Sequence, residues 1–243
     1  MGKQNNYIVC LDWETGGLDP QKNAVTQIGM EVLDPVTLKS IASYSSYIKP
    51  YPKKDVTKGK IKKLAKRESS EDTYVYDQKA LDYTNVTMEL LEEKGQDIKV
   101  VMEEMLEIFK LANPTNARNY KPVILGQNIT FDIGFLQHIF SYCGEKMDKY
   151  LNCNKDFFGN QQPIYFDTLY LAKQYYAEND KFTSHKLGLL SDDLGIELVN
   201  AHSAEADVQA TSGIFRLFIK NMRSSGDSET DDFAERARDH FKF

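Results

Sequence analysis

The sequence of 243 residues predicts an α/β protein in which helices flank a mixed sheet. Apolar stretches at 7–12, 26–34 and 38–48 are joined by short turns, and this pattern predicts an antiparallel meander. A fourth apolar stretch at 122–126 follows two helical patterns, so it should join the sheet after a helical crossover. Together these two observations predict the fold class.

The remaining elements are predicted from apolar residues that recur at helical spacing. Helices are expected near 78–94, 97–112, 130–143, 167–178, 186–194 and 203–222. A hydrophobic content of 41% is enough for a single globular domain, which we expect to span residues 1–222 with a polar insert at about 51–76. The polar segment 223–243 is expected to be a mobile tail.

Composition also indicates the cellular compartment that we expect for the protein. No apolar run approaches the length of a membrane span, and the first residues lack the hydrophobic segment of a signal peptide. Cys10, Cys143 and Cys153 are odd in number and lack metal-binding spacing, which is typical of a reducing compartment. A cytoplasmic protein without a membrane partner is expected.

A pair of carboxylates, Asp12 and Glu14, comes directly after the apolar run 7–11. Residues two apart on a strand point the same way, so both carboxylates should lie on one side of the sheet. Like charges so close repel unless a cation lies between them, and oxygen ligands favour hard ions such as Mg²⁺ or Mn²⁺. The alternative is that one carboxylate caps a turn while the other is solvated.

Two further carboxylates, Asp132 and Asp207, lie on the apolar faces of predicted helices. Asp132 shares its face with Phe135 and Ile139, and Asp207 begins a stripe that continues through Ile214. An ionised Asp on a packed face is costly unless it is paired or bound to a metal. Each could instead be stabilised by the dipole at a helix N-terminus. Combined with the Asp-x-Glu pair, they favour one shared metal site.

His202 precedes Asp207 by five residues, just before the last predicted helix. A loop side chain at this position can reach the same pocket, and imidazole groups exchange protons near neutral pH. The other histidines (His138, His185 and His240) have no comparable acidic setting. His202 is therefore the candidate for the general base.

These residues fall into three motifs. They are Asp12-Trp13-Glu14-Thr15 with Gly17-Leu18, Asn128-Ile129-Thr130-Phe131-Asp132 with Phe135-Leu136, and His202-Ser203-Ala204-Glu205-Ala206-Asp207. In type and order they resemble the motifs of the DEDDh family of 3′–5′ exonucleases, whose best-known cellular branch is the bacterial replicative proofreading subunit. The resemblance covers about 7–222 and implies a ribonuclease-H-like sheet. Trp13 departs from the small or polar residue common in the family, and Gly16 replaces a frequent Thr.

The resemblance implies a metal-dependent enzyme that removes nucleoside 5′-monophosphates from the 3′ end of single-stranded DNA, in proofreading or repair. It implies two divalent cations, Mg²⁺ or Mn²⁺. Asp12, Glu14 and Asp207 would hold one ion, Asp12 would also touch the second, and Asp132 would act through coordinated water. His202 would deprotonate the attacking water.

The same resemblance places residues in the substrate groove. The expected substrate-binding residues are Thr15, Leu18, Asn128, Phe131 and Phe135. For Leu18 and Phe131, which would contact the terminal nucleotide, ordinary core packing is an equal alternative. The implied partners are single-stranded nucleic-acid 3′ ends and a DNA polymerase or other replication protein.

A basic tract lies inside the polar insert, although the net charge is −6. The segment from residue 49 to residue 67 contains nine basic residues and one acidic residue, Asp55. We expect a nucleic-acid arm made of Lys53, Lys54, Lys58, Lys60, Lys62, Lys63, Lys66 and Arg67. The alternative is a solvated loop, which is the usual role of a charge run.

Two other functions are compatible with these motifs. One is a 3′–5′ exoribonuclease that acts on short RNA or RNA 3′ ends, because no motif here determines whether a 2′-hydroxyl is accepted. The other is a non-catalytic module that binds nucleic acid. The complete set of acidic residues and His202 argue against it, since clustered negative charge opposes binding to a phosphate backbone.

Overall fold

The computed structural model describes residues 6–53, 73–178, 184–198 and 201–224. Its centre is a five-stranded mixed sheet in the order β3-β2-β1-β4-β7. The strands are β1 (Ile8–Thr15), β2 (Val25–Leu33), β3 (Ser40–Tyr47), β4 (Val123–Gly126) and β7 (Tyr165–Asp167). β1, β2 and β3 form an antiparallel meander, and β4 pairs parallel to β1. The predicted ribonuclease-H-like sheet is confirmed.

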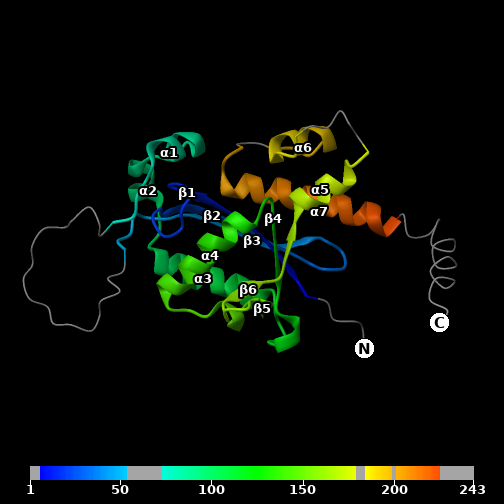
Figure 1. Ribbon diagram of the computed structural model, residues 1–243, viewed down its shortest axis with the longest axis horizontal. Coiled ribbons are helices and arrows are strands. Elements are labelled where there is room, and N and C mark those ends of the chain that lie inside the picture. The colour runs from blue at the N-terminus through cyan, green and yellow to red at the C-terminus, as the bar shows by residue number, and fades with distance from the viewer. Residues whose placement is uncertain (1–5, 54–72, 179–183, 199–200, 225–243) are drawn as a thin grey trace, which may run out of the picture.

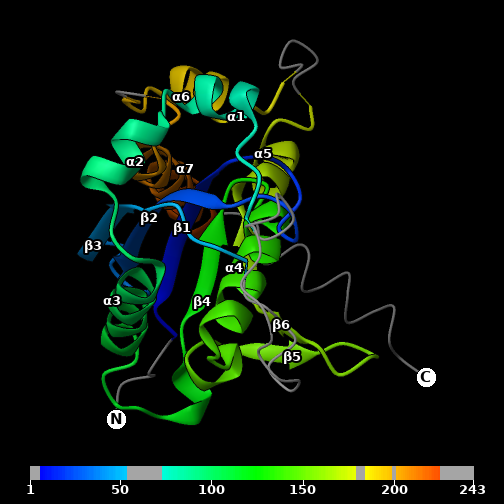
Figure 2. The same ribbon diagram turned by 90° about the vertical axis from the view of Figure 1, so that its left-hand side faces the viewer.

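Helices cover both faces of this sheet (Figures 1 and 2). They are α1 (Gln78–Thr84), α2 (Met88–Lys94), α3 (Ile98–Leu111), α4 (Thr130–Cys143), α5 (Thr168–Tyr175), α6 (Leu187–Leu194) and α7 (Ala204–Ser224). In Figure 1, α7 lies on one side of the sheet, while α3 and α4 lie on the other. None of the described helices is long and apolar enough to cross a membrane.

β1 is apolar on both sides because both of its faces are covered. Val9, Leu11 and Trp13 pack in the core shared with α3 and α4. Ile8 and Cys10 pack with residues of α7, on the opposite face. The alternation of side chains along a strand therefore directs the even-numbered residues of β1, including Asp12 and Glu14, to the α7 side.

The predicted end of β1 at residue 12 was too early. The strand continues to Thr15, because Glu14 pairs with Gln27 and Thr15 with Val25 on β2. Asp12 and Glu14 are therefore held by a hydrogen-bonded strand rather than by a chain that is leaving the sheet. This extension makes their spacing rigid.

The single helix predicted over 78–94 was also wrong. Asn85 adopts a left-handed conformation (φ 54°) and ends α1, and the Thr87 side chain then caps α2 by accepting from the N–H of Leu90. Asn tolerates this conformation better than most residues, and Thr is a favourable N-cap. The break turns α1 into a separate helix beside the end of β1.

Three short strands escaped prediction. β5 (Cys153–Lys155) and β6 (Gln161–Pro163) form a two-stranded hairpin, and β7 directly precedes α5. None carries an extended apolar pattern, since each has only three residues. Two short 3₁₀ helices, η1 (Arg118–Tyr120) and η2 (Met147–Lys149), complete the described elements.

Candidate active site

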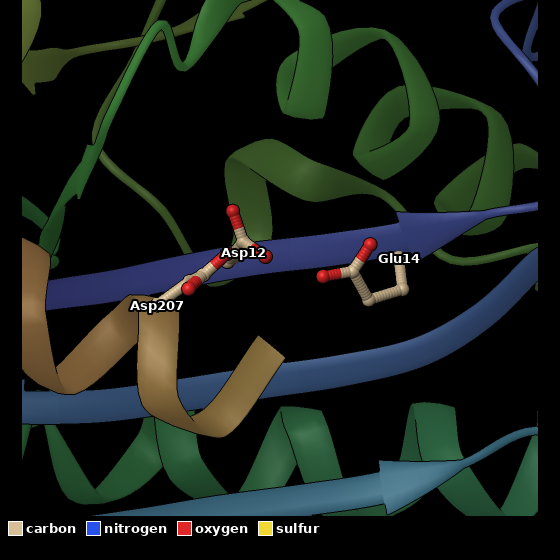
Figure 3. Close-up of side chains that lie close together, drawn as sticks. All are labelled: Asp12, Glu14 and Asp207. Atoms are coloured by element: carbon tan, nitrogen blue, oxygen red, sulfur yellow. The ribbon is translucent and has the colours of Figure 1, made fainter. Parts of the chain in front are cut away.

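Three carboxylates meet between β1 and the first turn of α7 (Figure 3). Asp12 and Glu14 come from β1 and Asp207 comes from α7, and their ligand oxygens lie within 4.8 Å of one another. The strand spacing of two residues aligns the first pair, and the packing of α7 on β1 adds the third. The structure thus brings together side chains that lie far apart in the sequence.

β2 positions the start of α7 over this cluster. Gly29 is the partner of Asp12 in the β1–β2 register, and a Cβ at residue 29 would lie 2.2 Å from the carbonyl oxygen of Ala204. The side-chain oxygen of Gln27, the partner of Glu14, accepts a hydrogen bond of 3.3 Å from the N–H of Ala204. A missing side chain and one hydrogen bond therefore place Asp207 beside β1.

Burial and mutual repulsion disfavour the ionised forms of this cluster. Burial raises the pKa of Asp12 to about 7, and the Asp207 carboxylate adds to the rise. Burial likewise raises the pKa of Glu14 to about 9, with further repulsion from Asp12 and Asp207. The pKa of Asp207 rises through burial, although His202 opposes that rise. A bound cation would reverse these shifts by stabilising the charged carboxylates.

Asp132 approaches the site from the other side of the sheet. It lies in the first turn of α4, is 4% exposed, and accepts a hydrogen bond of 3.0 Å from the backbone N–H of Trp13. Burial first and the neighbouring Asp12 second hold the pKa of Asp132 well above its usual range. Asp132 is not part of the compact group of three, but it contacts the strand residue between Asp12 and Glu14.

The cluster has the composition of a site for a hard divalent cation. All three donors are carboxylates, which are the ligands that Mg²⁺ and Mn²⁺ prefer. In the described part of the chain, Oδ1 of Asp207 is buried and has no hydrogen-bond partner. An unpaired buried carboxylate oxygen is costly, so a cation at this position would remove an energetic penalty.

His202 lies at the edge of the same cleft. It precedes α7 and adopts a left-handed backbone conformation (φ 69°), which is uncommon for a residue other than glycine. Its ring lies against the ring of Tyr83 from α1, with 4.1 Å between the ring centroids. His202 and Asp207 both line the cleft, as the sequence predicted.

The cleft around the cluster has a volume of about 990 Å³. Figure 1 shows α1 and α6 on the same side of the molecule, and residues of both helices form its walls. Tyr83 comes from α1, and Leu187 and Leu189 come from α6. Asp12, Glu14 and Asp207 line the same cleft, so a ligand bound in it would lie against them.

A second pocket of about 730 Å³ adjoins the cleft and shares Trp13, Glu14, Tyr83 and Phe131 with it. Leu18 lines this pocket and is 83% exposed, so the packing alternative does not apply to it. Phe131 is partly buried and lines both cavities.

The other three predicted substrate residues differ in their access to the cleft. Thr15 lines the second pocket, but its hydroxyl donates to the carbonyl of Gly17 at 2.7 Å. Asn128 is exposed in the main cleft, with its backbone N–H donating to Asp167. Phe135 lines neither of these cavities: it is 1% exposed and its ring packs against that of Phe131. It lies one helical turn beyond Phe131 on the same face of α4 and packs in the core.

Most of the predicted basic arm, residues 54–67, lies outside the described residues. Lys53 lies at its boundary, with its Nζ 5.6 Å from the centre of the Tyr74 ring. Residues 225–243 of the predicted tail lie outside them as well, whereas α7 extends to Ser224.

Sequence reasoning missed several residues that line the cleft. Tyr83 belongs to a helix that was not separated from α2, and Lys173 and Lys186 flank the cleft from α5 and the residue before α6. The two lysines are exposed. Lys186 begins the stretch Lys186-Leu187-Gly188-Leu189-Leu190, which resembles a family element, but sequence reasoning assigned neither lysine to the site; both line the same cleft as the carboxylates.

Comparison with known proteins agrees with this geometry. The family model described as exonuclease (RNase_T) matches residues 57–215, which is more than half of the chain. The chain belongs to this exonuclease family. Membership implies the use of divalent metal ions, and the acidic cluster provides carboxylates for them. The predicted family is thereby confirmed.

Among curated relatives, the PolC-type DNA polymerase III of Thermotoga petrophila is 26% identical over 223 residues. This alignment covers 92% of the present chain but 12% of the polymerase. The PolC-type polymerase of Clostridium perfringens is 30% identical over 105 residues, which cover 43% of this chain and 6% of the relative. The chain therefore spans only a small part of the polymerases that it matches.

Solved structures share the fold of this exonuclease-family chain. Escherichia coli Exonuclease I in complex with a dT13 oligonucleotide matches with a TM-score of 0.63 and 21% identity, over 88% of this chain and 41% of that one. The zinc-bound form of the Exonuclease I–single-stranded DNA complex matches with a TM-score of 0.65 and 21% identity, over 90% and 41% of the two chains. At this identity the likeness establishes the fold.

Proposed function

We propose that the protein is a metal-dependent 3′–5′ exonuclease that releases nucleoside 5′-monophosphates from single-stranded DNA. The cluster of Asp12, Glu14 and Asp207 carries this proposal. Burial and repulsion oppose the charged state of these carboxylates. Without a cation the cluster therefore lowers the stability of the fold, whereas its oxygen atoms are suitable ligands for divalent cations. All three residues line a large cleft, which gives a substrate access to them.

Asp12, Glu14 and Asp207 would hold Mg²⁺ or Mn²⁺, and Asp132 would support the site through its hydrogen bond to the Trp13 backbone. Two ions, when bound, would supply positive charge that stabilises the attacking and leaving oxygens of the phosphodiester. Asp132 lines the same cleft but is not part of the compact group of three, so its direct contribution to the ions would be smaller than that of Asp12.

His202 is the residue that would take the proton from the attacking water. It lies next to the carboxylate cluster and reaches into the cleft from the loop before α7. The new phosphorus–oxygen bond leaves a 5′-phosphate on the released nucleotide, and the bond to the 3′ oxygen of the remaining strand breaks. That oxygen takes up a proton from solvent, because the cleft is open.

Leu18 and Phe131 would contact the terminal nucleotide from the second pocket. An exposed Leu at the rim is otherwise unfavourable in water, and the base of a terminal nucleotide would cover it. Because the carboxylates are recessed, the 3′ end of a paired strand would have to fray before its last phosphodiester reached them. This recessed geometry favours single strands.

The proteins that this chain resembles support DNA as the substrate. The Exonuclease I structures with the same fold include complexes with DNA oligonucleotides, and the matched relatives are DNA polymerases. These likenesses favour DNA over the RNA alternative. They also support a role beside a replicative polymerase, where a 3′ end is repeatedly presented.

Product analysis on end-labelled oligomers tests the proposal. Single-stranded DNA and RNA of one sequence, labelled at the 5′ end, would be incubated with the protein in EDTA, Mg²⁺ or Mn²⁺. We expect a ladder that shortens from the 3′ end of DNA with either metal, release of 5′-mononucleotides, and no reaction in EDTA. Asp207→Asn, which keeps the size of the side chain, is the matched inactive control.

Four results would contradict the proposal. Internal cleavage would overturn the exonuclease assignment, and loss of the 5′ label as a mononucleotide would overturn the polarity. Faster shortening of RNA than of DNA would contradict the proposed preference for DNA. Full activity of Asp207→Asn would remove the acidic cluster from the mechanism.

A further inference from the structure

The rings of Tyr83 and His202 are in contact, and both residues line the cleft. Their centroids are 4.1 Å apart and their planes are inclined by 44°. Tyr83 belongs to α1, whereas His202 belongs to the loop that leads into α7, so the contact joins two elements that are far apart in the sequence. Separations below about 7 Å are typical of stabilising ring contacts.

The backbone of Tyr83 is firmly held. Its neighbours Leu81 and Thr84 are 3% and 8% exposed, and Leu81 packs with Val86 and Leu91 in a small core of its own. The Tyr83 side chain itself is 64% exposed and points into the cleft region that Asp12 and Phe131 also line. Tyr83 is therefore an exposed ring on a fixed support.

His202 is held less firmly by its own loop. Its left-handed backbone (φ 69°) places it at a turn, and Ala201 before it is exposed. Its backbone N–H donates to the Asp207 carboxylate, and a backbone hydrogen bond does not itself fix the side-chain torsions of the imidazole. A ring contact from another element can restrict these torsions, and α1 supplies one.

We propose that Tyr83 is a positioning residue for His202, holding the imidazole beside the acidic cluster through the contact between the two rings. This inference rests on the proposed function, in which His202 accepts a proton. The aromatic ring of Tyr83 carries the effect, and its hydroxyl is dispensable. Correct orientation of a general base contributes to turnover rather than to substrate affinity.

Steady-state kinetics on a single-stranded DNA oligomer would test the proposal with Tyr83→Ala, Tyr83→Leu and Tyr83→Phe. We expect both non-aromatic variants to lower kcat by roughly tenfold with little change in KM, because a loosened catalytic group loses productive geometry. Tyr83→Phe should retain the activity of the parent. The exposed position of the side chain favours folding of all three variants, and the Leu variant also preserves bulk.

Two kinetic outcomes would overturn the proposal. If Tyr83→Ala raises KM and leaves kcat unchanged, the ring is a platform for the nucleotide. If Tyr83→Ala still lowers kcat by the same factor in a His202→Ala background, it does not act through His202. The proposal requires that Tyr83→Ala has no further effect on kcat in the His202→Ala background.

Nuclear magnetic resonance of histidine ring protons provides a test that is independent of hydrolysis. His202→Ala assigns the signal of His202 among the four histidines. We expect this signal to carry a ring-current shift that Tyr83→Phe preserves and Tyr83→Ala removes. A parent protein without nuclease activity would refute the proposed function, whereas an active parent with an unchanged His202 signal in Tyr83→Ala would refute this inference alone.

Discussion

Gly29 lies directly opposite Asp12 in the β1–β2 register, and the backbone of Ala204 occupies the space where its side chain would be. A Cβ there would lie 2.2 Å from the carbonyl oxygen of Ala204 and 2.9 Å from the backbone nitrogen of Glu205. Neither atom belongs to a flexible side chain. One absent methyl group thus lets the start of α7 approach β2 closely, beside the strand that carries Asp12 and Glu14.

Gly29→Ala should therefore displace the start of α7 and with it Asp207. We expect a loss of about 1–3 kcal/mol in the free energy of unfolding, as for overpacked sites, and a fall in turnover on the order of 10²-fold. Denaturant titration and single-strand hydrolysis would measure the two effects. Gly134→Ala is the control, since its Cβ would meet Pro20 at an ordinary 3.5 Å. Equal effects of the two substitutions would contradict the argument.

Stability without metal should fall as pH rises. In the folded protein, burial and repulsion raise the pKa of Asp12 from 3.8 to about 7 and that of Glu14 from 4.5 to about 9. Between these limits the folded state keeps protons that the unfolded chain has released, so the free energy of unfolding decreases with pH. Thermal unfolding in EDTA should show a lower Tm at pH 8 than at pH 5.

Metal should counteract this loss, because a cation replaces the protons on the carboxylates. Mg²⁺ or Mn²⁺ is expected to raise Tm more at pH 8 than at pH 5. Asp12→Asn should flatten the pH dependence in EDTA and remove most of the metal effect. A Tm in EDTA that rises from pH 5 to pH 8 in the parent would contradict the described electrostatics.

His202→Ala should separate proton transfer from metal binding. Positioned general bases typically contribute about 10²–10⁴-fold to turnover, so we expect a loss of that order. Calorimetry with Mn²⁺ should show a much smaller change in affinity than in Asp12→Ala, because His202 is outside the carboxylate group. Equal losses of affinity in both variants would reassign His202 as a metal ligand.

The basic tract at 53–67 supports a prediction from sequence. Replacing Lys58, Lys60, Lys62 and Lys63 with Gln should raise KM on long oligomers at low salt, because fewer counterions are released on binding. Turnover of a dinucleotide should be unchanged. Matching KM values for the parent and the variant on long oligomers, at low and moderate salt, would leave only the loop interpretation.

Local patterns were sufficient for the parts of the molecule that repeat regularly. The alternation in β1 correctly predicted that Asp12 and Glu14 share a side, and the stripe on α7 correctly predicted that Asp207 faces the sheet. Other features depend on contacts between distant segments. Neither Gly29 nor Tyr83 has a distinctive sequence context, since the role of each follows from an element packed against it. Helical spacing correctly placed Phe135 on the apolar face of α4. That face is buried, so the spacing did not show whether Phe135 could reach a substrate.

The separation of the three clustered carboxylates along the chain has a consequence for synthesis. Asp12 and Glu14 leave the ribosome before Asp207, which follows with the last described helix, and that helix must then pack against β1 and β2. Until that step, the cluster lacks its third carboxylate. A nascent chain therefore holds an incomplete site, and the site is assembled only when α7 has packed against the sheet.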